Sequence, residues 1–254
     1  MPISSQHFDL PALKYRGRAS VAALAISLIT IGFLVLPNQR AFAQDPAMEQ
    51  KLEQIKQASA ANKQELAHFT WQEQQVISLK GDVKKTVIYQ VSIGPDGTQQ
   101  KTQLSSLPAP APPSGRRLKQ HIVEKKTDEF EEYGQQIAAL AKQYTQPDPQ
   151  AMQQAHQQGN ISLQPGGGEG TTSLVIKNYL KPGDTMTLVF NSEAKAIQSL
   201  QVSSYLSDPK DAVTLAVQFA KLPGGPNHVA SIQVDGVSKQ MTVAIQNSNY
   251  QQSQ

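Results

Sequence analysis

The amino-acid sequence predicts an α+β protein in which a curved antiparallel β-sheet, shaped as a half-open barrel, is covered by two or three helices. Two observations carry this prediction. Large apolar residues alternate with polar residues through most of 171–254, which is typical of strands that bury one face. Apolar residues instead recur at helical spacing in 45–66 and in 114–158, and amphipathic helices can shelter the apolar face of such a sheet.

The first 43 residues have the three parts of a secretory signal peptide. A basic stretch ends at Arg18, an uncharged apolar run covers 19–36, and Ala41-Phe42-Ala43 offers small residues to signal peptidase. We therefore expect cleavage near Ala43 and a periplasmic or secreted mature protein, with the signal peptide only transiently in the membrane. The apolar run is nearly long enough to span a bilayer, so an inner-membrane protein anchored by an uncleaved leader is the alternative.

Residues 44–106 are predicted as a helix followed by a β-hairpin. The helical spacing of 45–66 begins after Asp-Pro, which favours a helix start because Asp can cap free amides and Pro fits the first helical position. An extended segment at 69–80 is followed by an alternating one at 83–93. A Pro-Asp-Gly turn then directs 98–104 back as the partner strand.

The middle of the chain changes character twice. Residues 107–113 contain four prolines in seven residues, which predicts a stiff connection without a helix or a central strand. Residues 114–170 are predicted as a helical segment, with a short helix restarted at Asp148-Pro149 and ended by Gly159, followed by a Gly-rich loop at 165–170. Residues 171–254 form the predicted antiparallel meander, and 44–254 together are predicted to be one domain.

Composition removes several classes of function. The chain has no Cys, which excludes disulfides, zinc ribbons and cysteine nucleophiles, and no two of its five His residues have a spacing typical of metal ligands. No phosphate loop, nucleophile elbow, zincin helix or dinucleotide fingerprint is present. Outside the leader, basic and acidic residues balance, so the net charge of +3 is no indication of nucleic-acid binding. We expect no enzyme activity, no cofactor and no metal.

Two sets of residues are candidates for contacts with other molecules. Apolar and aromatic residues on the predicted inner faces are the candidates for lining a ligand cavity, although residues with this spacing also form an ordinary core. They are Trp71, Tyr89, Val91, Phe130, Tyr133, Ile137, Leu188, Phe190, Leu215, Val217, Phe219 and Val243. A basic cluster at the start of the second helical segment, Arg116, Arg117 and Lys119, is the candidate for contact with a protein partner, the alternative being a solvated helix face.

The order of the elements resembles a known superfamily. A leader and a helix precede the segment 69–73 (Phe-Thr-Trp-Gln-Glu), and the closing half contains Leu-Val-Phe-Asn at 188–191, Leu-Gln-Val at 200–202, the strand 213–219 and the ending at 243–250. This arrangement is similar to that of the periplasmic lipoprotein carriers LolA and LolB and the sigma-regulatory proteins RseB and MucB. The resemblance implies an incompletely closed antiparallel barrel, covered by helices, with an apolar hollow for acyl chains.

Two functions follow as hypotheses. In the first, an exported cell-envelope protein binds an apolar ligand, a lipid, a lipoprotein or an acyl chain, without covalent chemistry; such sites are concave and mostly apolar. In the second, an envelope scaffold or regulatory protein acts through protein–protein contacts and has no ligand cavity. The resemblance favours the first hypothesis, whereas the physical pattern of the residues fits both.

Overall fold

A computed structural model describes residues 46–108, 117–146 and 148–253, and these fold into helices and strands of one α+β architecture. The helices are α1 (Pro46–Leu66), α2 (Arg117–Thr145) and α3 (Pro149–Gln157). The strands are β1 (Phe69–Leu79), β2 (Asp82–Ile93), β3 (Gln99–Pro108), β4 (Ile161–Pro165), β5 (Thr171–Lys177), β6 (Thr185–Asn191), β7 (Ala196–Tyr205), β8 (Ala212–Lys221), β9 (Asn227–Gly236) and β10 (Met241–Gln252).

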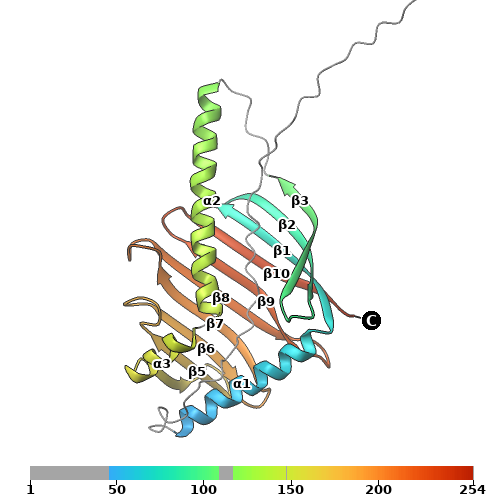
Figure 1. Cartoon of the computed structure of the whole chain (residues 1–254), viewed down its shortest axis with the longest axis vertical. Helices are drawn as coiled ribbons and strands as arrows, with labels where there is room; N and C mark the ends of the chain where they lie inside the picture. Colours follow the sequence, from blue (N-terminus) through green and yellow to red (C-terminus); the bar gives the residue numbers. More distant parts are fainter. Residues whose placement is uncertain (1–45, 109–116, 147, 254) are drawn as a thin grey trace, which may run out of the picture.

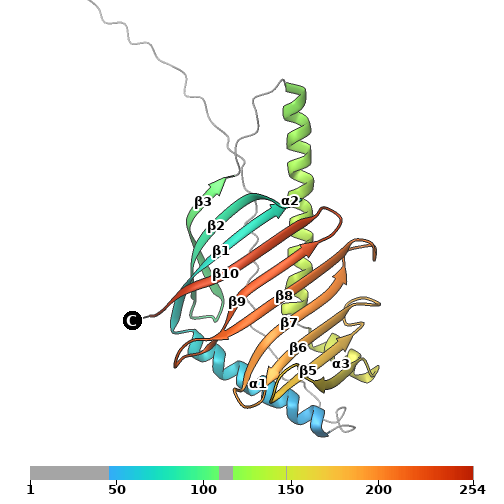
Figure 2. The ribbon, with the colours of Figure 1, turned by 180° about the vertical axis from the view of Figure 1, so that it is seen from behind.

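All ten of these strands belong to one antiparallel sheet with the order β3-β2-β1-β10-β9-β8-β7-β6-β5-β4. The sheet is not closed, because β3 and β4 are its two edges. Figure 1 shows the three helices on one side of the sheet, and Figure 2 shows the opposite side, which no described helix covers. The α+β prediction, with an antiparallel sheet that stays open and carries helices on one face, is confirmed.

The two faces of the sheet differ because side chains alternate along each strand. In β6, Met186, Leu188 and Phe190 are buried, whereas the residues between them are partly exposed. The same alternation recurs in β7, β8 and β10. We call the apolar side that carries the helices the inner face; the outer face is rich in Thr, Gln and Ser.

Shifts in strand register help the sheet to curve. Two of them lie between Ile77 and Ser78, where β1 pairs with β2, and between Ile88 and Tyr89, where β2 pairs with β3. A β-bulge adds a residue to one strand and bends it, and Figure 1 shows β2 and β3 strongly bent along their length. This curvature matches the predicted half-open shape.

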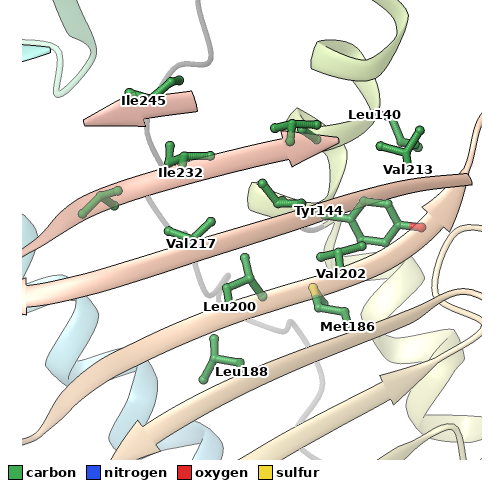
Figure 3. Close-up of a cluster of buried hydrophobic side chains, with 14 of the residues drawn as sticks. Leu140, Tyr144, Met186, Leu188, Leu200, Val202, Val213, Val217, Ile232 and Ile245 are labelled. Carbon is green, nitrogen blue, oxygen red and sulfur yellow. The ribbon is translucent and has the colours of Figure 1, made fainter. Parts of the chain in front are cut away.

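Helix α2 is held on the inner face by two tyrosines. The Tyr133 hydroxyl donates a hydrogen bond of 2.8 Å to Asp211 Oδ1, and the Tyr144 hydroxyl contacts Asp184 Oδ2 and, at 2.8 Å, Ser204 Oγ. Figure 3 shows Tyr144 and Leu140 of α2 above apolar side chains of the sheet. Burial and the bond to Asp211 raise the pKa of Tyr133 to about 12, so its hydroxyl keeps its proton at neutral pH.

Helices α1 and α3 are fixed by their own polar contacts. In α1, the Asn62 amide donates to the Asn227 carbonyl oxygen at 2.7 Å and accepts from the Asn227 backbone N–H at 2.6 Å, which joins the helix to the start of β9. Helix α3 begins where Asp148 accepts a 3.0 Å bond from the Gln150 N–H. The predicted restart at Asp148-Pro149 is therefore confirmed, and Gly159, with a positive φ of 70°, follows the end of the helix.

Two predicted boundaries are wrong. The C-terminal meander does not begin at Thr171: the preceding strand β4 pairs with β5, and the Gly-rich segment is the turn that joins them. Only Ile161 and Leu163 of β4 show the alternation, which is too short a pattern to separate from a loop. Strand β3 also extends through Leu107 to Pro108, because an edge strand tolerates Pro where no ladder hydrogen bond is required. Residues 109–116, the rest of the predicted connection, lie outside the described residues.

We expect Asp184→Ala to lower the free energy of unfolding by at least about 3 kcal/mol. The buried Asp184 carboxylate accepts backbone hydrogen bonds from Tyr179, Leu180 and Lys181 in addition to the Tyr144 hydroxyl, and removal would leave these donors unpaired. Urea unfolding measures the change. The matched control is Asp208→Ala, which removes an exposed turn bond to the Lys210 N–H and should cost less than about 1 kcal/mol. Equal losses in the two variants would contradict the proposed tether.

Candidate functional site

The inner face carries apolar rows that cross the sheet from strand to strand. In one row the paired residues run from β6 through β7, β8, β9 and β10 to β1; they are Met186, Val202, Leu215, Val234, Val243 and Ile77. The neighbouring row runs through Leu188, Leu200, Val217, Ile232 and Ile245 and ends at Gln75 of β1. Figure 3 shows part of both rows beneath α2. We call these two rows the apolar rows.

The predicted lining residues divide between strands and helix. Eight of them are buried on β1, β2, β6, β8 and β10: Trp71, Tyr89, Val91, Leu188, Phe190, Leu215, Val217 and Val243. Tyr133 and Ile137 are buried on α2, where they pack between the helix and the sheet. Phe130 and Phe219 are only partly buried. The set therefore shares one face of the molecule, and its role in binding stays a prediction.

The helices cover this face unevenly. The backbone of α1 comes closest to β7 and β9, and that of α2 comes closest to β9. The inner faces of β10, β1 and β2 nevertheless carry buried apolar side chains, including Val243, Ile245 and Val91. The apolar rows thus continue, as buried side chains, onto strands other than those that the two helices approach most closely.

A buried polar cluster adjoins the apolar rows on β1 and β10. Glu73 lies on β1 with 0% of its surface exposed, and Glu73 Oε1 accepts 2.6 Å bonds from Gln75 Nε2 and from Lys101 Nζ. Asn247 faces Glu73 directly across the β1–β10 pairing. We call Trp71, Glu73, Gln75, Lys101 and Asn247 the Glu73 cluster.

Lys101 reaches Glu73 from the edge of the sheet. It lies on β3, two strands away from β1, and its ammonium group passes 6.0 Å from the centre of the Tyr89 ring on the strand between them. Lys101 keeps 12% of its side chain exposed, so the cluster borders on solvent at this edge. Burial and the nearby Glu73 carboxylate raise the pKa of Tyr89, which keeps that ring neutral.

Aromatic rings form one side of the cluster. The Trp71 ring stacks on the Tyr250 ring with 5.4 Å between centroids and 15° between planes. The His228 ring also contacts the Tyr250 ring, with 4.2 Å between centroids. Burial, followed by the charge of Glu73, raises the pKa of Tyr250. Burial lowers the pKa of His228, so the imidazole is neutral at pH 7. The charges that remain are the paired Glu73 and Lys101.

Three buried polar atoms in the cluster have no hydrogen-bond partner among the described residues: Glu73 Oε2, Asn247 Oδ1 and Trp71 Nε1. A buried polar atom without a partner costs about 1–3 kcal/mol, so most folded proteins leave few of them. Their concentration on one part of the inner face marks the Glu73 cluster, together with the apolar rows, as the candidate functional site.

The sequence contained a signal for this cluster. Trp71, Glu73, Gln75 and Ile77 are alternate residues of one strand, so a charged and an amide side chain occupy positions in phase with a Trp and an Ile. An inward carboxylate needs a partner, which points to a polar site. That the partners are Lys101 and Asn247 follows only from the strand pairing.

The predicted protein-contact residues lie at the edge of what the structure describes. Arg116 lies outside the described residues, and Arg117 and Lys119 belong to the first turn of α2, whose side chains also lie outside the described set. Figure 1 shows that this end of α2 extends past the edge of the sheet. In the described part of the chain, no helix is both long enough and apolar enough to cross a membrane. The predicted signal peptide and its cleavage site lie outside the described residues.

Similarity to known proteins is found among solved structures. No protein-family model and no curated protein matches the chain. Among solved structures there is a match to a DUF1329 family protein. That crystal structure, from Desulfovibrio piger, is 12% identical in sequence, superposes with a TM-score of 0.36, and the match covers 79% of this chain and 92% of that chain. The resemblance to lipoprotein carriers stays a prediction, and the function has to be argued from the residues of this chain.

We expect Lys101→Met to destabilise the protein by roughly 3–5 kcal/mol, because it leaves the buried Glu73 carboxylate without its cation. The double variant Glu73→Leu/Lys101→Met should recover most of this loss, since it removes both charges. Urea unfolding measures both. As a control, Lys84→Met breaks the exposed pair between Lys84 and Asp82 and should cost less than about 1 kcal/mol. A double variant less stable than Lys101→Met would contradict this account.

Proposed function

We propose that this chain is an exported cell-envelope protein that binds an apolar ligand, a lipid or an acyl chain, non-covalently on the inner face of its half-open sheet. The observation that supports the proposal is the continuation of the apolar rows onto β10 and β1, beyond the strands that α1 and α2 approach most closely. The signal peptide predicted in 1–43 supports the location.

The chemistry of the face suits a chain of methylene groups. Each methylene buried contributes about 0.8 kcal/mol, so an acyl chain of a dozen methylenes gains on the order of 10 kcal/mol before the cost of ordering it. The apolar side chains of the rows are Val, Leu, Ile and Met, which form no hydrogen bonds and so do not require a particular ligand orientation. The Glu73 cluster beside them provides the few polar groups that orient a ligand in a mostly apolar site.

We expect Val243→Thr to weaken the binding of a fluorescent apolar probe about 5- to 30-fold. The substitution keeps the volume of the side chain but puts a hydroxyl into an apolar row, which costs about 1–2 kcal/mol if the ligand offers no hydrogen bond. Titration of N-phenyl-1-naphthylamine fluorescence measures the dissociation constant. The matched control is Gln246→Thr on the exposed outer side of the same strand, which should leave binding unchanged.

Protein recovered from the periplasm provides a separate check. Native mass spectrometry and organic extraction should find a bound lipid, and the bound form should unfold at a higher temperature than delipidated protein. Protein that carries no lipid and does not bind the fluorescent probe would rule out this function.

The projecting end of α2 favours a second candidate, an envelope scaffold or regulatory protein that acts through protein contacts. A helix end that extends past the sheet offers a surface separate from the apolar rows (Figure 1). We expect charge reversal at Arg116, Arg117 and Lys119 to abolish a crosslinked partner in the envelope without changing the melting temperature. Unchanged crosslinking would count against this candidate.

A further inference from the structure

Two acceptor atoms of the Glu73 cluster that have no donor among the described residues belong to side chains that are paired directly across two strands. Glu73 and Asn247 are directly opposite on β1 and β10, and side chains at such positions leave the same face with Cβ atoms about 4.5–5.5 Å apart. Both residues are more than nine-tenths buried, and Glu73 Oε2 and Asn247 Oδ1 have no donor among the described residues. Two acceptors cannot satisfy each other, so the pair requires donors from elsewhere.

The orientation of the Asn247 amide is fixed by its neighbour. Asn247 Nδ2 donates a 2.9 Å hydrogen bond to the Val229 carbonyl oxygen. A rotated amide would place two oxygens against each other there, so Oδ1 must be the atom directed into the cluster. The site therefore presents one carboxylate oxygen and one amide oxygen.

Trp71 adds an unpartnered donor to the same region. It precedes Glu73 by two residues on β1, so both side chains leave the same face of the strand, and its Nε1–H has no acceptor in the described part of the chain. A group that satisfies all three atoms must both donate and accept hydrogen bonds. Hydroxyl groups do both, whereas an ammonium group only donates and a carboxylate only accepts.

The charge of the cluster also favours a neutral group. Glu73 is already paired with Lys101 at 2.6 Å, so the cluster is balanced before any ligand enters. A further cation or anion would be buried without a counter-charge, which is unfavourable in a water-poor site. One hydroxyl donates one hydrogen bond, so two acceptors call for two hydroxyls.

From this geometry we propose that the Glu73 cluster recognises a neutral diol head group of an amphiphile whose hydrocarbon chain lies on the apolar rows. The cluster lies next to those rows, because Glu73 is two residues from Gln75 and Asn247 two residues from Ile245. This inference rests on the proposed function, and it names the class of ligand that the same site selects.

Three probes, each with a linear chain of twelve carbons, test the proposal in the full mature protein. They are 1-lauroylglycerol, which carries the diol, methyl laurate, which has no donor, and dodecylamine, which carries an ammonium group. Their dissociation constants are measured by displacement of the fluorescent probe. We expect the monoglyceride to bind about tenfold more tightly than the methyl ester, and the ammonium amphiphile to bind no more tightly than the ester.

Asn247→Leu removes one acceptor at nearly constant volume and should reduce the preference for the diol to about threefold or less, with methyl laurate binding unchanged. The Val229 carbonyl oxygen keeps the Tyr250 hydroxyl as a donor. The matched control is Gln246→Leu on the outer side of the same strand, which should keep the full preference. Should Asn247→Leu fail to fold, Trp71→Phe removes the indole donor while keeping an aromatic ring on Tyr250, and it should reduce the preference in the same way.

The outcomes distinguish a failure of the diol proposal from a failure of the proposed binding of an apolar ligand. Equal binding of monoglyceride and methyl ester, or tighter binding of the ammonium amphiphile, overturns the diol site but leaves an apolar ligand site intact. Equal weakening of all three probes in Asn247→Leu assigns the residue a structural role and overturns the inference as well. Absence of binding by every probe overturns both proposals.

Discussion

The pairing of β1 with β10 is the contact on which the rest of this structure depends. It joins a strand near the start of the described chain to the last one, so that the N-terminal hairpin and the C-terminal meander become a single sheet. Such a contact closes a loop of most of the chain, and its entropic cost is recovered through the ladder and the burial of Val243, Ile245 and Trp71. The same register places Glu73 opposite Asn247. The fold and the candidate site therefore have a common origin.

The helices cover the apolar face of the sheet. A strand that alternates strictly buries one face, and a sheet of this size cannot leave that face in water. Helix α2 supplies apolar cover, but two hydrogen bonds set its position on the sheet. Tyr133 donates to Asp211, and Tyr144 donates to Asp184. Apolar packing alone would tolerate sliding, whereas a buried hydroxyl must meet its acceptor. These hydrogen bonds hold α2 near the starts of β6 and β8, and not near β10 or β1.

Much of the fold could be predicted because its signals are local. Alternation identified β5 to β10, and helical spacing with Asp148-Pro149 identified α1, α2 and the start of α3. β4 was missed because two apolar residues do not make a pattern. The candidate site was predicted only in its apolar part, since Glu73, Lys101 and Asn247 come from three distant segments and each is unremarkable alone. Their meeting depends on strand order and register, which local periodicity does not encode.

The Glu73 cluster has no clear use in holding the sheet together. Apolar side chains occupy the corresponding positions in the rows beside it, and replacing a buried ion pair with apolar residues often leaves stability unchanged or improves it. Three polar atoms of the cluster also lack a partner within 46–108, 117–146 and 148–253, each at a cost to the folded state. Buried polar groups that lower stability because they lack a partner within the protein are typical of sites that bind another molecule. In the proposed function, these atoms lie where the apolar rows end and would let the site discriminate between head groups on ligands with the same hydrocarbon chain.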